Sequence, residues 1–284
     1  MTIEFIRDDD KSFILGGSYA DSAAWGILSL SGISEVSNEI AAEKNAVGDG
    51  DIITGYRIPA RSIDIESCVK NKTNNVIERH KALAFFNPKH SFKVFITRDG
   101  VTRWIVALIE KFKCPEQNLS KNVRLDVALK CVDPYFYSKD DFGKNIAAVK
   151  TTFGFPFISP VGKGFNVGIY NFKRAIGVEN TGDVETYFSI RLEAFGDVAN
   201  PKVIKDNAYI RIIDTLHKND VVQVNLVDNT IRKNGVNCIG KVDRTSSFSG
   251  MRLDVGNNTV SFAADDGDTN MRVLLYYNLR YLGA

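Results

Sequence analysis

Residues 123–131 read Val123-Arg124-Leu125-Asp126-Val127-Ala128-Leu129-Lys130-Cys131, with an apolar side chain or cysteine at every odd position. A second stretch, Val184 to Ala194, carries its apolar side chains at even positions and mostly charged or polar ones between them. Because successive side chains of a strand point to opposite faces, each stretch predicts a strand with one buried and one wet side. Such half-exposed strands are typical of antiparallel sheets. The chain is therefore predicted to be mainly β.

Turn signals support this prediction. Asp99-Gly100 stands between two strand-like runs, and this dipeptide favours the positive φ values of a tight hairpin. Asp228-Asn229 is a weaker signal of the same kind. One helix is predicted, at about 75–87, where Asn75 serves as the cap and Glu78 occupies the reciprocal capping position. Asn87-Pro88 ends it, because proline cannot continue a helix.

The pattern divides the chain into two predicted domains. Residues 1–138 form the first, 139–150 a linker, and 151–284 the second, a β-sandwich in which regular alternation returns near Val178. The run Met271 to Leu279 is apolar on both faces, which predicts a strand that is central in the second domain or held between the domains. We expect the following residues, Arg280 to Gly283, to pack back towards the first domain.

Composition excludes several classes of protein. The 284 residues carry a net charge of +2, so no electrostatic signal points to nucleic acid or to an anionic membrane. The first residues lack the pattern of a signal peptide, and no window is apolar enough to span a bilayer. Four scattered cysteines without a CxxC spacing are typical of buried thiols in a protein made in a reducing cytoplasm.

No motif for catalysis, cofactor binding or metal binding is present. The sequence lacks a GxSxG elbow, a GxxxxGK[ST] phosphate loop and an HExxH zinc helix, and His80, His90 and His217 have no ligand spacing. Asp8-Asp9-Asp10 is interpreted as a solvated turn between two strands, and Asp265-Asp266-Gly267-Asp268 as a hairpin tip. We therefore predict no catalytic, cofactor-binding or metal-binding residues, and a protein that is not an enzyme.

Several segments occur in a fixed order over nearly the whole chain. They are Tyr56–Ile65, the predicted helix with Asn87-Pro88, Asp133-Pro134-Tyr135-Phe136-Tyr137, Lys218–Val224, Lys233-Asn234-Gly235, Ser246-Ser247-Phe248, Gly256–Phe262 and Tyr276–Leu282. This order resembles the distal tail protein family of siphophages. Tyr56–Ile65 looks like the family's arginine-containing strand, and the Asp133-Pro134 segment looks like the end of its first domain.

The resemblance implies a fold and a place in a virion. The first domain would be a β-sandwich or split barrel with one helix that builds a ring of six subunits, and the second a galectin-like β-sandwich. The ring would lie at the tail tip, between the major tail tube protein and the tail-associated hub or fibre protein, with a receptor-binding protein as a further possible partner. The loop Val47–Asp51 is expected either to reach a neighbouring subunit or the channel, or to be a mobile hairpin tip.

Two alternatives remain open. One is a carbohydrate-binding β-sandwich module of a cell-surface or tail protein, and the other is a β-sandwich hydrolase. The His-Asn-Arg set with Trp and Glu through which galectins bind sugar has no counterpart in this sequence, so the galectin-like likeness concerns the fold and carries no lectin activity. An exposed aromatic ledge on the second domain favours the sugar-binding alternative, and two facing carboxylates in a cleft favour the hydrolase.

Overall fold

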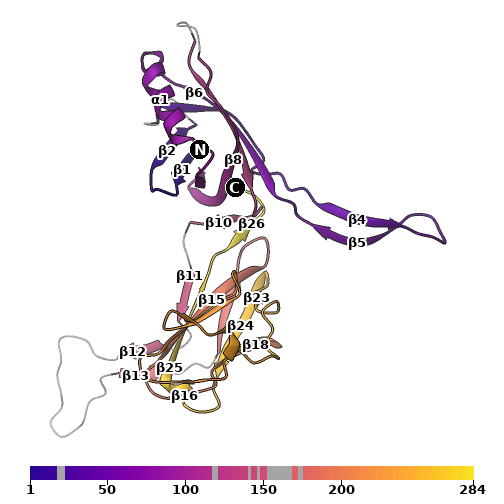
Figure 1. Cartoon of the computed structure of the whole chain (residues 1–284), viewed down its shortest axis with the longest axis vertical. Helices are drawn as coiled ribbons and strands as arrows, with labels where there is room; N and C mark the ends of the chain where they lie inside the picture. Colours follow the sequence, from indigo (N-terminus) through magenta and orange to yellow (C-terminus); the bar gives the residue numbers. More distant parts are fainter. Residues whose placement is uncertain (18–22, 117–120, 140–141, 146–147, 152–167, 172–174) are drawn as a thin grey trace, which may run out of the picture. The chain divides into compact units, whose positions relative to one another are not determined.

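The structure is a computed structural model that describes residues 1–17, 23–116, 121–139, 142–145, 148–151, 168–171 and 175–284. The chain divides into two compact units, Met1–Lys139 together with Arg280–Ala284, and Asp140–Leu279. Strands predominate, and one α-helix lies within these ranges, which confirms the prediction of a mainly β fold (Figure 1). No helix in the same ranges has the length and hydropathy needed to cross a membrane.

The first unit is built on one curled sheet. Its strands, in spatial order, are β26 (Arg280–Tyr281), β10 (Phe136–Ser138), β8 (Val101–Lys113), β7 (Ser91–Arg98), β1 (Thr2–Arg7), β2 (Ser12–Gly16), β3 (Trp25–Ser31), β6 (Arg61–Val69) and β9 (Arg124–Cys131). Neighbours run antiparallel except β2 and β3, which are parallel. The first part of β8 pairs with β7, and its second part pairs with β9 beyond a register shift between Ile109 and Lys111. This second pairing closes β8 to β9 into a barrel.

The predicted alternation places the core inside this barrel. Leu125, Val127, Leu129 and Cys131 of β9 are all buried, as the sequence pattern predicts. The hairpin at Asp99-Gly100 is also confirmed, because both residues have positive φ and join β7 directly to β8. Asp8-Asp9-Asp10 forms the predicted turn between β1 and β2, where the Arg7 amide donates to the Lys11 carbonyl at 2.9 Å.

A helix packs on the barrel, but its start differs from the prediction. The helix α1 (Asn75–Phe85) follows a 3-10 turn η1 (Lys72–Asn74) and ends before Asn87-Pro88 as predicted. The prediction that Asn75 and Glu78 form a capping box is wrong. The Asn75 side chain instead donates to the Lys121 carbonyl at 3.0 Å and accepts from the Val123 amide at 3.2 Å. Tertiary contacts to the segment just before β9 therefore fix the helix start in place of a local cap.

Glu78 also has a tertiary role. Its carboxylate is buried and accepts a hydrogen bond from Trp25 Nε1 at 3.2 Å and from Lys81 Nζ at 2.7 Å. The last turn of the helix carries Phe85 and Phe86 into the barrel core, where the Phe86 ring lies 5.2 Å from Phe5 in an edge-to-face arrangement. The aromatic residues at the helix end thus lock the helix to the sheet.

The second unit contains four sheets among its described residues. The largest has the order β11 (Phe142–Asn145), β25 (Met271–Tyr277), β15 (Thr186–Ala194), β20 (Val221–Asn225), β21 (Thr230–Lys233) and β22 (Val236–Asn237), and β23 (Arg252–Leu253) also pairs with β15. The second has the order β14 (Ala175–Asn180), β24 (Gly256–Ala263), β17 (Lys202–Lys205) and β18 (Ala208–Arg211). The two short sheets pair β12 (Ala148–Thr151) with β13 (Gly168–Asn171) and β16 (Val198–Ala199) with β19 (Thr215–Leu216). Short 3-10 turns are η2 (Ile239–Lys241) and η3 (Asp268–Asn270). The galectin-like description of this unit stays a prediction.

Two predictions for the second unit hold, since the even positions of β15 are buried and the turn at Asp228-Asn229 joins β20 to β21. The prediction that β25 is apolar-buried on both faces is wrong. Met271, Val273 and Leu275 are fully buried, but Tyr276 on the other face is exposed. β25 is nevertheless central in its sheet, between β11 and β15, so its position follows from pairing on both edges and not from two buried faces.

Two further segments differ from the prediction. The range 139–150, predicted as a linker, contains β11 and β12, because β11 pairs with β25 and β12 with β13. Asp265–Asp268 is no hairpin tip, since β24 and β25 on its two sides belong to different sheets. The segment is a connection between layers, and Asp265 binds Arg211 and Asn200 there. A hairpin and a crossover share the same polar signature, so the sequence does not separate them.

A cluster of charges holds the β20–β21 hairpin. Lys233 Nζ lies 3.1 Å from Asp214 and 2.9 Å from Asp220, and Asp214 also accepts from Lys241 at 2.8 Å. The hydrogen bond from the His217 amide, followed by those from Asn234 and Lys233, holds the pKa of Asp220 far below its usual value. The Lys241 and Lys233 ammonium groups lower the pKa of Asp214 in the same way.

This cluster predicts an acid-sensitive hairpin. Because the folded-state pKa of Asp220 lies below its unfolded value of about 3.9, its contribution to stability is complete above that pH and is lost as pH falls towards the folded pKa. We expect Asp220→Asn to speed amide exchange of residues 215–234 by the same factor between pH 7 and about pH 5, and the difference from the wild type to shrink as the pH falls below about 4. Hydrogen–deuterium exchange at matched pH measures both. A difference that stays constant between pH 7 and pH 3 contradicts this explanation.

Candidate assembly interface

A two-stranded ribbon projects from the barrel of the first unit. It consists of β4 (Glu39–Lys44) and β5 (Asp51–Arg57), which pair antiparallel with each other and with no other described strand. Figure 1 shows both strands extending away from the barrel. All residues of β4 and all of β5 except Gly55 are exposed. Both outer edges of the ribbon therefore present unpaired backbone groups, which are a template for pairing with another chain.

One face of the ribbon is apolar. Ile40 lies opposite Tyr56 and Ala42 lies opposite Ile53, so these four side chains share a face. Tyr56 and Ile53 are three residues apart and would face opposite sides in a regular strand. The register shift between Ala41 and Ala42 places an extra residue in β5 and brings both to the same side.

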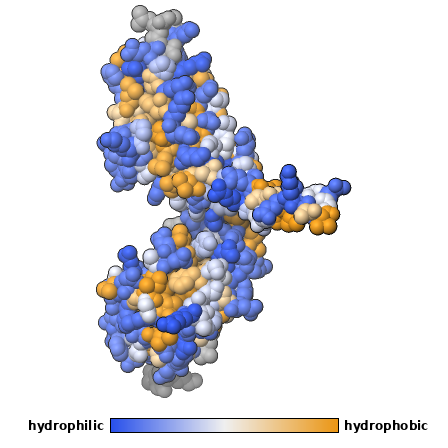
Figure 2. Space-filling view, turned by 45° about the vertical axis from the view of Figure 1, so that its right-hand side comes forward, coloured by the Kyte–Doolittle hydropathy of each residue, from blue (hydrophilic) through white to orange (hydrophobic). Residues whose placement is uncertain are grey.

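These apolar side chains are unusually exposed. The exposed fractions are 59% for Ile40, 65% for Ile53 and 80% for Tyr56, and Figure 2 shows hydrophobic residues along the projecting ribbon. The opposite face carries the ion pair of Arg57 Nε with Glu39 at 2.6 Å. An apolar face next to a charged face, with no cover from the described residues, is typical of a surface that another protein covers.

Arg61 fixes the base of the ribbon. Its guanidinium donates to four backbone carbonyls, those of Pro134 (2.7 Å), Gly32 (2.7 Å), Glu35 (2.8 Å) and Leu282 (2.5 Å). The same group lies 5.0 Å from the centre of the Phe136 ring. The side chain is 7% exposed and forms no salt bridge within the described residues. Burial accordingly lowers the pKa of the guanidinium from its ordinary value.

The end of the chain joins the same site. β26 pairs with β10, Ala284 N donates to the Ile33 carbonyl at 3.1 Å, and Arg103 Nη1 donates to the Gly283 carbonyl at 2.5 Å. The Arg103 guanidinium lies 3.7 Å from the centre of the Tyr281 ring. The last five residues, which follow the second unit in sequence, are therefore part of the first unit and contact the segment that leads into the ribbon.

The sequence predicted the structure of this region only in part. It predicted Tyr56–Ile65 as one arginine-containing strand, but the structure breaks it into β5 and β6 at Ile58-Pro59-Ala60. Proline lacks the amide that a central strand needs, so the break was readable at Pro59. The burial of Arg61 could also have been predicted from the sequence, because Arg61 occupies the same strand face as the buried Ile63 and Ile65. The loop Val47–Asp51 lies at the tip of the ribbon.

The histidines and cysteines form no shared site among the described residues. His90 contacts Asp8 at 2.5 Å, His217 contacts Asp197 at 2.8 Å, and His80 is exposed on α1. All four cysteines are free, and burial raises the pKa of Cys131 to about 12. Within the described ranges no group of three His, Cys, Asp or Glu side chains is arranged to hold a metal ion. The aromatic segment Phe153–Phe157 lies outside the described residues.

Comparison with protein families gives one match, which lies mostly in the second unit. Residues 181–281 match the family model of the siphovirus-type tail component, C-terminal domain. No curated protein sequence matches the chain. Among solved structures, the Dit protein of phage SPP1 aligns over 99% of both chains with a TM-score of 0.70 at 13% identity. A chain of the activated phage P2 baseplate with Ca aligns over 100% of both chains, with a TM-score of 0.52 at 8% identity.

Residues 181–281 thus match the C-terminal domain of siphovirus-type tail components, and the whole chain has the fold of the SPP1 Dit protein. The family match and the fold together confirm the predicted distal tail protein family of siphophages. A second baseplate structure, of phage p2 with Sr, has a TM-score of 0.53 at 8% identity over 100% of this chain and 99% of that chain. At these identities the likeness to each solved structure concerns the fold.

The Arg61 contacts predict a strong effect of substitution. Arg61→Met removes the hydrogen bonds that Arg61 donates to four carbonyls at a part-buried site, so we expect the first unit to lose about 3 kcal/mol of unfolding free energy. Urea unfolding followed by tryptophan fluorescence measures it, because both tryptophans, Trp25 and Trp104, lie in that unit. Arg57→Met is the control, since its ion pair is exposed, and should change stability by less than about 0.5 kcal/mol. Equal unfolding midpoints for the two variants would refute the anchor.

Removal of Arg280–Ala284 tests the role of the chain end separately. The shortened chain loses β26 and one Arg61 acceptor, so its tryptophan-detected unfolding should move to lower urea, by about 2 kcal/mol of stability. Amide exchange of β15 and β20 in the second unit should stay unchanged, because these residues belong to the other unit. The explanation fails if the tryptophan signal is unaffected or if both units lose stability together.

Proposed function

We propose that this chain is a structural subunit of the tail-tip hub of a siphophage and that it assembles as a closed ring of six copies through residues 1–138. The observation that carries the proposal is the uncovered apolar face of the β4–β5 ribbon. The family match supports the tail component, and the SPP1 Dit protein of the same fold is described as a paradigm of hub adsorption apparatus in phages that infect Gram-positive bacteria.

The ribbon favours a heterologous contact. It projects from one place on the unit, so a ribbon that docks on a different surface of the next copy gives a head-to-tail interface. Such an interface generates a ring when the rotation between copies closes. The barrel itself has few free edges, because β8 pairs with both β7 and β9. The edges and the apolar face of the ribbon are thus the contacts that the first unit offers.

The proposal includes the neighbours in the tail. The ring lies between the major tail tube protein and the tail-associated hub or fibre protein, and the second unit is available to a receptor-binding protein. The chain is made in the host bacterial cytoplasm and resides at the distal end of the virion tail. The four free thiols support synthesis in a reducing compartment. The baseplate chains of similar fold support a place in a larger tail assembly.

We further propose that the chain catalyses no reaction. Three of its four thiols are poor nucleophiles, because burial raises the pKa of Cys114, Cys131 and Cys238. Among the described residues, His90 and His217 each contact a single exposed carboxylate and no hydroxyl or thiol nucleophile. A structural role in a family of tail components agrees with these environments.

Ring assembly can be tested at Ile53. A lysine there places a charge on the apolar face of the ribbon without changing any buried contact of the single chain, so Ile53→Lys should fold normally and fail to assemble. Val236→Lys in the second unit is the matched control, because Val236 is 71% exposed on the short strand β22. Analytical ultracentrifugation over a concentration series should show six-subunit rings for the wild type and the control only.

Two results contradict the proposal. One is assembly of Ile53→Lys at the same concentrations as the wild type, which would remove the ribbon from the interface. The other is a ring, seen by electron microscopy, in which only the second units touch. A ring with a subunit number other than six would correct the stoichiometry and retain the interface.

A further inference from the structure

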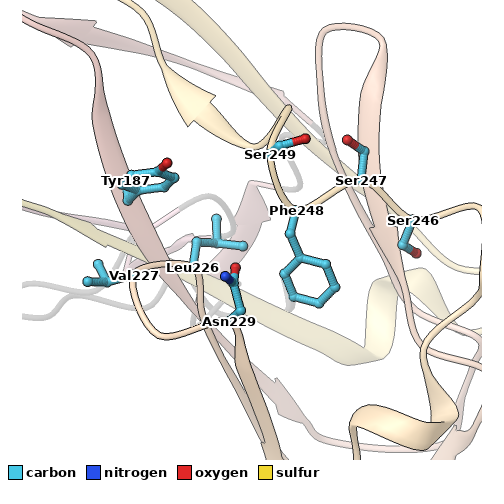
Figure 3. A pocket seen from close by; sticks show the side chains of 8 residues that line it. All are labelled: Tyr187, Leu226, Val227, Asn229, Ser246, Ser247, Phe248 and Ser249. Carbon is cyan, nitrogen blue, oxygen red and sulfur yellow. The ribbon is translucent and has the colours of Figure 1, made fainter. Parts of the chain in front are cut away.

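A pocket opens at one end of the second unit. It has a volume of about 540 Å³ and is lined by Tyr187, Leu226, Val227, Asn229 and Ser246–Ser249 (Figure 3). Three separate segments supply this lining: the beginning of β15, the turn between β20 and β21, and the loop that precedes β23. The volume lies in the range of about 300–1,000 Å³ that is usual for small-molecule sites.

The loop that carries Phe248 is held in place by its backbone. Ser247 N donates to the Tyr209 carbonyl at 3.0 Å, and Met251 N donates to the Phe248 carbonyl at 3.1 Å. The Ser246 hydroxyl accepts from the Arg211 amide at 3.0 Å. These bonds engage the loop backbone and the Ser246 side chain, and the Phe248 ring is left half-exposed, beside Asn229 in the pocket (Figure 3). The ring is therefore positioned at the pocket and is not packed into the core.

The opposite wall of the pocket is also held by hydrogen bonds. Val227 N donates to Asn225 Oδ1 at 2.9 Å, which shapes the turn, and Asn229 has a φ of 52°. The buried Leu226 forms an apolar floor, and the half-exposed Tyr187 ring stands at the side. Within the described residues, the Tyr187 hydroxyl, the Asn229 amide and the Ser249 hydroxyl form no hydrogen bond to the protein. These groups are free to bind a ligand.

The chemistry of the lining selects a class of ligand. No lining residue is charged, so the pocket offers nothing to compensate the desolvation of an ionic ligand. Two aromatic rings and an aliphatic floor match a flat C–H surface, and hydroxyl and amide groups match a rim of hydroxyls. A pyranose sugar has both features. An apolar peptide side chain in the pocket would leave the Ser249 hydroxyl and the Asn229 amide without partners.

We infer that this pocket binds a neutral pyranose saccharide, with Phe248 and Tyr187 against the sugar faces and Asn229 and Ser249 on its hydroxyls. The site lies within the second unit and is independent of ring assembly, so either proposal can fail without the other. On a tail-tip protein, such a site would contact polysaccharide on the surface of the host cell.

The test uses the intact chain and purified neutral sugars: glucose, galactose, mannose, N-acetylglucosamine, N-acetylgalactosamine and their common disaccharides. Saturation-transfer NMR detects which of them binds, and a titration gives the affinity. Phe248→Ala should weaken the binding of that sugar by about ten-fold, because an aromatic contact is lost. Phe195→Ala is the matched control, since Phe195 is an exposed aromatic residue of the same unit outside the pocket, and should bind like the wild type.

A second variant separates lost chemistry from altered folding. Asn229→Gly removes the amide and keeps a residue that tolerates the positive φ, so the turn should survive while sugar affinity falls. An unchanged melting transition confirms that the variant is folded. The inference is overturned if no sugar in the panel binds the wild type, or if Phe248→Ala and Phe195→Ala bind equally. It is also overturned if a neutral peptide library yields a ligand that Asn229→Gly weakens while no sugar binds.

Discussion

The Arg61 guanidinium is the contact on which the first unit depends. It is a buried cation that forms no salt bridge with the carboxylates of the described residues, and it is stabilised instead by four carbonyls and an aromatic face. The carbonyls belong to Gly32 and Glu35 before the ribbon, Pro134 after the barrel, and Leu282 at the chain end. A buried charged group that donates four hydrogen bonds to these segments favours one arrangement of them, because another arrangement would leave the buried charge with fewer partners. The ribbon therefore projects from a defined base.

The contacts of Arg61 also join residues 280–284 to the first unit. The chain leaves the first unit after β10, builds the second unit, and returns to add β26 at the edge of the first sheet. The first unit is complete only after the last residues are made, so its final contacts form after the second unit has been synthesised. The apolar face of the ribbon is exposed in the single chain, which agrees with the proposed contact with another copy. The pocket of the second unit has a different chemistry, uncharged and rich in hydroxyls.

Local patterns predicted much of the fold and little of its assembly surface. The alternation of β9 and β15 was readable because each strand has one buried face, and Asp99-Gly100 was readable because its turn needs positive φ. The cap at Asn75 was misread because a tertiary partner, the segment before β9, competes for the same side chain. The apolar face of the ribbon depends on a register shift between strands, which no periodicity within one strand reveals. The pocket beside Phe248 is built from three segments that are distant in sequence, so no local pattern reveals it either.

Assembly through the ribbon, residues 39–57, is tested most directly by amide hydrogen exchange of the ribbon in the dissociated chain and in the assembled ring. We predict fast exchange of the outer-edge amides in the dissociated chain, since β4 and β5 pair only with each other among the described strands. On assembly these amides should become protected, while β20 and β21 in the second unit exchange as before. A ring in which the ribbon exchanges as fast as in the dissociated chain would contradict the account.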